Sequence, residues 1–372
     1  MFPAWAKVWS LDSNAIYFNS TLTNFVAWIN LNDYGDIITT GNLGAIRVTV
    51  SGAEVARAIY ADVGLMKIIM PTAPAAGAPV DIYYDNPLAS DYAATDPFGS
   101  YAVKNPTYDY AKTFWEPTPV SSSFAANDEA TGAAANNGTA VNLGSSRNAA
   151  GSLVQRWDFT GAVAGTANAD RIDLGGSAVD LSGGWPFTLS AWVTVKNSGY
   201  TFGLQTIYSD YASFTGQRNF IWGYNAPSGQ FRFVNWDASN NINDVYSTTV
   251  RSGDPNGTEH HVLFSVDAAG NWAFYVNGSP DGSGTYSVNR HHAGSSAQIN
   301  IGAVYRSSNW HDLLCEGHLT DLRVSESIAL GADWAYAEYN NKQPNFWIDN
   351  GWSFNGSPPV SFIGHTVQSF IY

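Results

Sequence analysis

The chain has 372 residues with a formal net charge of −14, and only 13% of the residues are charged. This negative balance argues against a protein that binds the phosphate backbone of nucleic acids, and against docking on an anionic membrane surface. The low charge, the 35 glycines and the many aromatic residues favour an all-β protein with at least two domains and many tight turns.

The distribution of apolar residues and the number of cysteines bear on where the protein is made and on which covalent or metal cross-links it can form. Residues 1–20 lack the apolar core of a secretory signal, and no segment approaches the roughly 18 apolar residues of a membrane span. We therefore expect synthesis in a cytoplasm, no membrane insertion and no ordinary export. The single cysteine, Cys315, excludes an intrachain disulfide and a cysteine zinc cluster, and we expect it to be a small buried apolar residue.

The first third of the chain contains short alternating runs that predict strands. They lie at residues 21–31, 46–50, 54–59, 65–70 and 80–84, and turn signals separate them. These runs predict a small β-sandwich domain over residues 1–115. The motifs LTNF at 22–25, LGAIR at 43–47 and VDIYYDNP at 80–87 also resemble a bacterial β-sandwich domain of unassigned function, at about residues 5–115. The resemblance implies no activity, but that domain commonly accompanies a laminin-G-like module.

A proline-containing linker at residues 116–123 precedes a second predicted domain at 124–345. Its central element is the run 187–195, in which apolar residues alternate with Thr188, Ser190, Trp192 and Thr194, as in a half-buried strand. A meander follows at 205–208, 220–224 and 230–236. A hairpin is predicted from 260–266 and 272–276, and Asn277-Gly278 is a strong turn signal. Strands at 298–303 and 318–324 and a short helix at 332–341 complete the domain.

Residues 120–345 resemble the concanavalin A-like and laminin-G-like lectin domains. The motifs that carry the resemblance are IDLG at 172–175, FTLSAWV at 187–193, YVNG at 275–278 and GHLTDLRV at 317–324. The family's usual Ile-Asp-Glu is replaced here by Leu319-Thr320-Asp321. The resulting prediction is an all-β protein with two antiparallel β-sandwich domains, of which the second is a concanavalin A-like jelly roll. A short C-terminal tail, residues 346–372, is expected to dock on a sandwich or to contact another subunit.

The sequence contains neither of two catalytic motifs that are typical of hydrolases. Glycoside cleavage needs two carboxyl groups in one cleft, but the glutamates are scattered and no Glu-x-Asp-x-x-Glu run occurs. No Gly-x-Ser-x-Gly elbow is present. The pairs His260-His261 and His291-His292 are adjacent, so on a strand their side chains would point to opposite faces and neither pair alone would make a metal site. We therefore predict a protein that is not an enzyme and contains no catalytic residues.

Sugar binding requires an aromatic ring to stack on the sugar and polar groups to bind its hydroxyls. Candidates in predicted loop-proximal positions are Tyr211, Trp222, Trp236, Arg306 and Trp310, for which the alternative is a place in the core or at a subunit contact. Laminin-G-like modules often hold calcium, and this resemblance implies a weaker set of candidate calcium ligands. They are aspartates in predicted loops: Asp210, Asp237, Asp244 and Asp312.

Lectin-type sandwiches usually act outside cells, whereas this sequence shows no export signal. A virion component resolves that conflict, because it assembles in the cytoplasm and leaves by lysis. The sequence thus predicts a bacteriophage structural protein of the head-fibre, decoration or tail-fibre type that presents a carbohydrate-binding module. Expected partners are a cell-surface glycan, other virion proteins and further copies of the chain. The alternatives are an extracellular bacterial adhesin and, third, a polysaccharide-acting enzyme.

Overall fold

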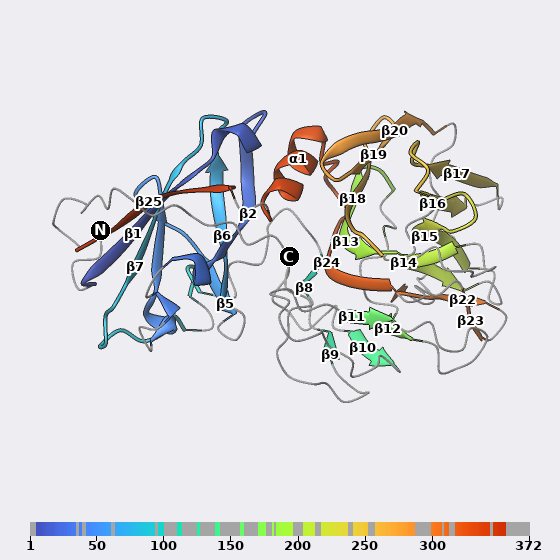
Figure 1. Ribbon diagram of the computed structural model, residues 1–372. Helices are drawn as coiled ribbons and strands as arrows, with labels where there is room; N and C mark the ends of the chain where they lie inside the picture. The colour runs from blue at the N-terminus through green and yellow to red at the C-terminus, as the bar shows by residue number, and fades with distance from the viewer. Residues whose placement is uncertain are drawn as a thin grey trace. The chain divides into compact units, whose positions relative to one another are not determined.

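The computed structural model confirms an all-β protein built from antiparallel sheets (Figure 1). It describes residues 5–34, 37–38, 42–60, 64–93, 96–99, 110–113, 125–126, 138–141, 157–159, 170–175, 181, 184–195, 204–212, 217–236, 241–251, 257–286, 299–306, 309–311, 317–342 and 345–354. The chain divides into two compact units. The first holds residues 1–103 and 340–372, and the second holds residues 104–339. The predicted linker at 116–123 lies outside the described residues.

The first unit contains two sheets. The strands are β1 (Lys7–Ser13), β2 (Leu22–Asn30), β3 (Arg47–Val50), β4 (Ala53–Glu54), β5 (Arg57–Tyr60), β6 (Leu65–Ala73), β7 (Pro79–Tyr84) and β25 (Trp347–Phe354). They form the orders β25-β1-β7-β3-β4 and β2-β6-β5. Leu11 and Ile82 from one sheet, and Phe25 and Met66 from the other, are fully buried. Four of the five strands predicted before residue 85 are present, the one predicted at 54–59 is divided into β4 and β5 in different sheets, and β1 was missed.

The C-terminal tail enters this first unit. Strand β25 pairs antiparallel with β1, so residues 334 to 347 positions apart in the sequence lie side by side. The indole of Trp9 donates a hydrogen bond to Asp349 over 2.7 Å, and the indole of Trp347 donates to the carbonyl of Trp28 over 2.6 Å. Phe346 is completely buried. The rest of the predicted tail, residues 355–372, lies outside the described part of the chain.

The second unit contains two larger sheets and one α-helix. The elements are β8 (Tyr110–Thr113), β9 (Ala125–Ala126), β10 (Gly138–Val141), β11 (Trp157–Phe159), β12 (Arg171–Gly175), β13 (Phe187–Thr194), β14 (Leu204–Ala212), β15 (Gln217–Asn225), β16 (Gln230–Trp236), β17 (Ile242–Tyr246), β18 (Glu259–Val266), β19 (Asn271–Val276), β20 (Ser279–Thr285), β21 (Ile299–Ile301), β22 (Val304–Arg306), β23 (Asn309–His311), β24 (Gly317–Ser325) and α1 (Ala332–Asn340). The predicted first domain ended at residue 115, but β8 pairs with β24 of this second unit.

The two sheets of the second unit enclose an apolar core. One has the order β17-β16-β15-β14-β21-β12-β10-β9, and the other the order β11-β24-β13-β18-β19-β20. Alternate residues of each sheet point inward, so Phe187 and Phe264 of the second sheet meet Phe233 of the first, with ring centroids 5.5 and 4.6 Å from it. The predicted hairpin is β18-β19, and Asn277-Gly278 forms the next turn with positive φ at both residues.

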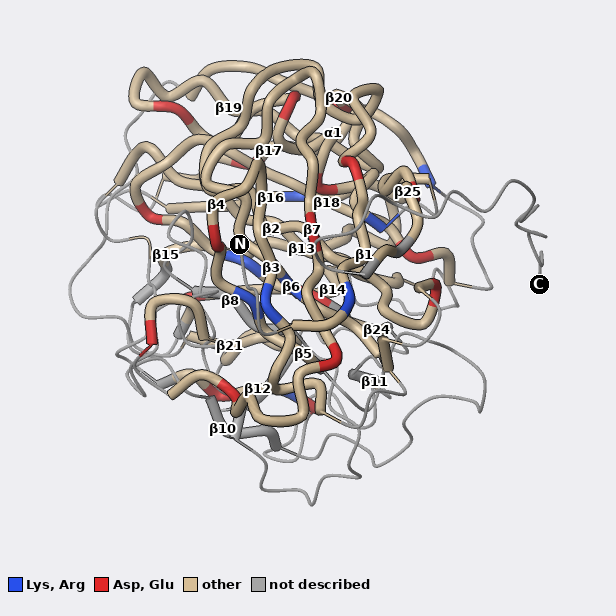
Figure 2. Tube along the Cα trace, turned by 90° about the vertical axis from the view of Figure 1, so that its left-hand side faces the viewer, with Lys and Arg blue, Asp and Glu red and all other residues tan. Residues whose placement is uncertain are grey.

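Charged residues are sparse along the described trace, where Lys, Arg, Asp and Glu are separated by long uncharged stretches (Figure 2). Because charged residues are sparse, packing of apolar faces, supported by a few buried polar contacts, carries most of the stability of each unit. None of the described helices is long and apolar enough to cross a membrane.

The central strand β13 differs from the prediction in one respect. A half-buried strand was expected, but Thr188, Ser190, Trp192 and Thr194 on the outward side are all buried as well. The reason is that α1 and the segment before it cover this outer face. Tyr339 of α1 stacks on Trp192 with ring centroids 5.7 Å apart, and Figure 1 shows α1 beside β18.

A buried polar network holds α1 on this face. Glu338 accepts hydrogen bonds from Ser190 over 2.8 Å and contacts His261 Nε2 over 3.0 Å, and it forms an ion pair with Arg323. Arg323 also donates to Asp321 over 2.8 Å. Burial alone raises the pKa of Glu338, but Arg323, His261 and Ser190 together outweigh it and lower the pKa to about 2. Glu338 is therefore ionised at neutral pH, and it contacts polar side chains on β13 and on two further strands, β18 and β24.

This network is not a nucleophilic triad. A general base uses one imidazole nitrogen toward the nucleophile and the other toward the orienting carboxylate. Here His261 Nε2 faces both Ser190, at 3.2 Å, and Glu338. All three side chains are also almost fully buried. The arrangement can anchor a helix, but it presents no hydroxyl to a substrate.

Candidate functional site

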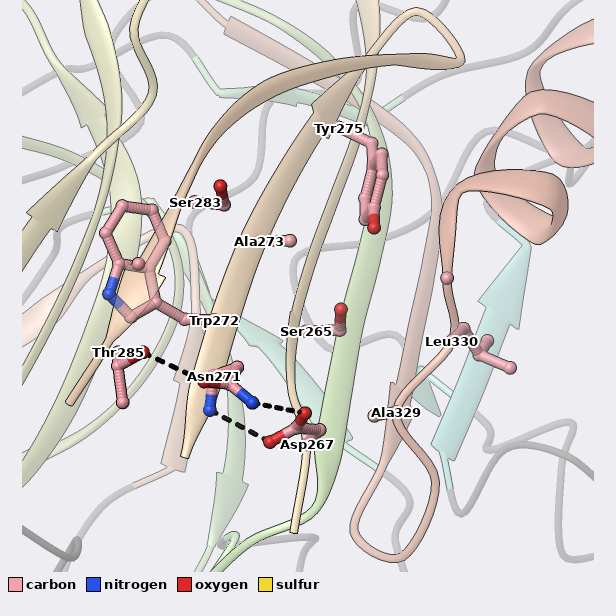
Figure 3. Close-up of a pocket in the computed structure, with 12 residues that line it drawn as sticks. Ser265, Asp267, Asn271, Trp272, Ala273, Tyr275, Ser283, Thr285, Ala329 and Leu330 are labelled. Carbon is pink, nitrogen blue, oxygen red and sulfur yellow. Dashed lines mark hydrogen bonds between the residues drawn. The ribbon is translucent and has the colours of Figure 1, made fainter. Parts of the chain in front are cut away.

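An open groove lies on the outer face of the sheet that contains β18, β19 and β20. Its volume is about 480 Å³, within the range of about 300–1,000 Å³ that is usual for small-molecule sites. Figure 3 shows Tyr275 at one end of the groove, Asp267, Asn271 and Thr285 at the other, and Leu330 along one side.

The floor of the groove consists of small side chains. Ser265, Ala273 and Ser283 face one another across three neighbouring strands, because the β18-β19 and β19-β20 pairings align them in register. Side chains this short leave the backbone of the sheet close to the surface. A flat ligand can therefore lie against the sheet between the taller walls.

Tyr275 forms the aromatic wall. It follows Ala273 by two positions on β19 and so projects from the same face. Burial of part of the ring raises the pKa of Tyr275, and the negative charge of Asp333 on α1 raises it further. The phenol therefore stays protonated at neutral pH, with a ring face for stacking and a hydroxyl that can donate.

The side wall of the groove comes from the segment between β24 and α1, and Thr188 holds it in place. The Thr188 hydroxyl accepts a hydrogen bond from the Leu330 amide over 2.9 Å and donates one to the Ile328 carbonyl over 2.7 Å. Thr188 lies on β13, next to the groove strands. Because the Ile328 carbonyl and the Leu330 amide both bond to the Thr188 hydroxyl, this wall has a defined position.

The polar end of the groove is the β18-β19 turn. Asp267 accepts hydrogen bonds from the backbone amides of Ala269 and Asn271, over 2.8 and 2.9 Å, and from the Asn271 side chain over 2.8 Å. These bonds, the Asn271 side chain first, lower the pKa of Asp267. Asn271 also accepts from the Thr285 hydroxyl over 2.8 Å. The cluster is pre-ordered, solvent-exposed and rich in acceptors.

The aromatic residues named from the sequence do not line this groove. Trp222 has no exposed surface and belongs to the core between the sheets, so in this structure it contributes packing. Tyr211 and Trp236 do come together, with ring centroids 5.0 Å apart, on the outer face of the other sheet. Both are nearly buried there. Arg306 and Trp310 lie on the paired strands β22 and β23, and their side chains are outside the described part of the structure.

The four candidate calcium ligands are not gathered at one place in the described residues. Asp210 and Asp244 were expected in loops but lie in strands β14 and β17, since β14 extends to residue 212 and β17 was not predicted. Two strands separate β14 from β17, which corresponds to about 14 Å. Asp244 forms a two-pronged ion pair with Arg232 at 2.7 Å, and Asp210 accepts from Asn219 over 2.6 Å. Asp237 and Asp312 lie outside the described residues.

Within the described ranges, no three His, Cys, Asp or Glu side chains converge as metal ligands. The donors present at Asp210 and Asp244 therefore do not fit a shared calcium site. His260 and His261 point to opposite faces of β18, as predicted. His260 packs against Phe231, and His261 faces Glu338. Cys315, His291 and His292 lie outside the described part of the chain.

Sequence reasoning missed the groove for a physical reason. Tyr275 and the turn residue Asn271 lie in the predicted hairpin, but a two-residue period does not tell which face of a strand is covered and which is open. Leu330 comes from a segment with no regular structure. The available signal was the row of small residues on one face of three consecutive strands, with a single tyrosine among them.

Comparison with known proteins confirms the predicted lectin-like domain. Residues 165–334 match the model of the concanavalin A-like lectin/glucanases superfamily. This segment contains all of the groove residues. It excludes the first unit, for which the resemblance to a bacterial β-sandwich domain stays a prediction. No curated protein matches the chain.

Among solved structures, the binding domain of botulinum neurotoxin serotype D is similar at 10% identity, with a TM-score of 0.45, over 64% of this chain and 52% of that one. The binding domain of botulinum neurotoxin DC in complex with SialylT has 12% identity and a TM-score of 0.45 over 64% and 52%. The CBM40 of the Ruminococcus gnavus IT-sialidase has 12% identity and a TM-score of 0.35 over 41% and 82%. The chain thus spans about half the length of the toxin domains.

Proposed function

We propose that the second unit is a carbohydrate-binding module and that the groove between Tyr275 and Asp267 receives the sugar. The observation that carries this proposal is the arrangement of one protruding aromatic ring, a flat floor of small residues and a pre-ordered polar turn within one groove. A pyranose ring has an apolar face that stacks on an aromatic side chain and a rim of hydroxyls that seek acceptors. The superfamily matched by residues 165–334 includes lectins, which agrees with this role.

The groove supports binding rather than bond cleavage. The matched superfamily also includes glucanases, and glycoside hydrolysis uses two carboxyl groups about 5–9.5 Å apart across the bond. Among the described residues that line the groove, Asp267 is the only carboxylate. Its low pKa also makes it a poor general acid, because it holds no proton at neutral pH.

For the whole chain we propose a virion structural role of the head-fibre, decoration or tail-fibre type, with the groove used for attachment. The support is the combination of two all-β units, few charged residues and a glycan-type groove on one of them. Other virion proteins and further copies of the chain are the proposed assembly partners. An extracellular adhesin is the second candidate, and the same groove would serve it. Mass spectrometry of purified virions tests the role directly, and absence of the chain from particles would favour the adhesin.

The experiment for the binding function is a glycan array probed with the full chain, followed by titration of the best ligand. Tyr275→Ala should lower affinity at least tenfold, whereas Tyr275→Phe should keep most of it because the ring remains. Tyr246→Ala, on the other sheet, is the matched control. A chelator arm tests calcium, for which Asp237 and Asp312 remain the proposed ligands. The proposal is wrong if no glycan binds or if Tyr275→Ala leaves binding unchanged.

A further inference from the structure

The charge in the described lining of the groove has one sign. Of the twelve described residues that line it, none is Lys, Arg or His, and Asp267 is the one that carries a charge. A second carboxylate, Asp333 on α1, is close enough to Tyr275 to affect its ionisation. A ligand in the groove therefore lies between a carboxylate at the polar end and another beside the aromatic end.

The hydrogen-bonding groups of the groove match this charge pattern. Asp267 and Asn271 present carboxylate and amide oxygens, which accept from hydroxyl groups. The donors that the lining offers to a ligand are the hydroxyls of Ser265, Ser283 and Tyr275, because the Thr285 hydroxyl already donates to Asn271. Recognition of a carboxylate or sulfate normally relies on guanidinium, ammonium or clustered backbone amide donors. The described lining provides no cationic donor of this kind.

We infer that the groove selects neutral pyranose glycans and discriminates against glycans that carry sialic acid, uronic acid or sulfate. This inference rests on the proposed function, because it specifies the ligand class of the same site. The physical basis is electrostatic. A ligand anion a few ångströms from Asp267 meets a repulsion that no cation in the described lining offsets, and the cost in solvent-exposed surroundings is about 1 kcal/mol. That cost corresponds to an affinity about fivefold lower for the acidic member of a matched pair.

The test uses matched pairs of glycans that differ by one acidic group, such as a neutral oligosaccharide and its sialylated form. Titration of the full chain should give at least about fivefold weaker binding of the acidic member at low salt. The ratio should shrink toward one as ionic strength rises, since exposed charges are screened. Asp267→Asn should reduce the ratio at low salt even where it weakens neutral binding, because the ratio compares two ligands on the same variant, and Asp244→Asn, on the other sheet, should not change the ratio.

The outcomes separate this inference from the function on which it rests. Equal or tighter binding of acidic glycans, still dependent on Tyr275, would overturn the selectivity and leave the carbohydrate-binding role intact. Failure of every glycan to bind would overturn both. If Asp267→Asn disturbs the turn, the salt dependence of the unaltered chain still decides the question, because it needs no substitution.

Discussion

Glu338 on α1 and Arg323 on β24 form an ion pair in which both side chains are at most 5% exposed. They lie fifteen positions apart in the sequence, and His261 and Ser190 contact the same carboxylate from two further strands. A helix of nine residues is too short to be stable in isolation. This contact therefore explains why α1 forms and why it covers the outer face of β13.

Glu338→Gln is expected to destabilise the second unit by about 3 kcal/mol. Removing one partner of a buried ion pair costs about 3–5 kcal/mol. We expect the lower end of this range because Arg323 keeps its ion pair with Asp321 in the variant. Denaturant unfolding followed by tryptophan fluorescence measures the loss. Asp244→Asn breaks the half-exposed pair with Arg232 and should cost less than about 1 kcal/mol. Equal effects of the two substitutions would contradict the anchoring role.

The same carboxylate predicts a loss of stability in acid. The folded protein lowers the pKa of Glu338 from its ordinary value of 4.5 to about 2, so the unfolded chain binds this proton first as pH falls. Its contribution to stability is complete above about pH 4.5 and declines as pH drops toward 2. Calorimetric scans between pH 5 and pH 2 should show a steeper fall in melting temperature for the unaltered chain than for Glu338→Gln. Parallel curves would exclude Glu338 as the group responsible.

Thr188→Val should weaken glycan binding without direct contact with the ligand. It removes the hydroxyl that ties the Ile328–Leu330 segment to β13 and leaves a buried amide and carbonyl without that partner, at a cost of about 1–3 kcal/mol. Thr194→Val is the matched control on the same face of the same strand. The Thr194 hydroxyl is buried and has no hydrogen-bond partner among the described residues. Binding and stability assays of both variants should separate them, with little change for Thr194→Val.

Phe346→Ala should destabilise the first unit by about 3–5 kcal/mol. The ring is completely buried, with centroids 5.4 Å from Phe18 and 6.3 Å from Phe25. Ile348→Ala, two residues along, is the control, because that side chain is 46% exposed and should change stability by less than about 0.5 kcal/mol. Limited proteolysis adds a second readout, since loss of Phe346 should release β25 to cleavage. Resistance of both variants to protease would contradict docking of the tail.

Local patterns in the sequence were sufficient for the fold class and for most strands. The period of two in residues 187–193, the hairpin at 260–276 and the Asn277-Gly278 turn each reflect short-range constraints of backbone geometry, which neighbouring residues express directly. The match of residues 165–334 to a lectin superfamily agrees with motifs visible in the sequence.

Which faces are covered was decided only by tertiary structure. Trp222 and Tyr275 are both aromatic residues in alternating strands, yet Trp222 is in the core and Tyr275 borders a groove. Glu338 meets Ser190 across 148 positions, and Leu330 meets Thr188 across 142. Such contacts depend on how separate elements pack, and a pattern of near neighbours contains no information about that packing. The all-β architecture was therefore readable from the chain, whereas the groove and the anchor of α1 required the folded structure.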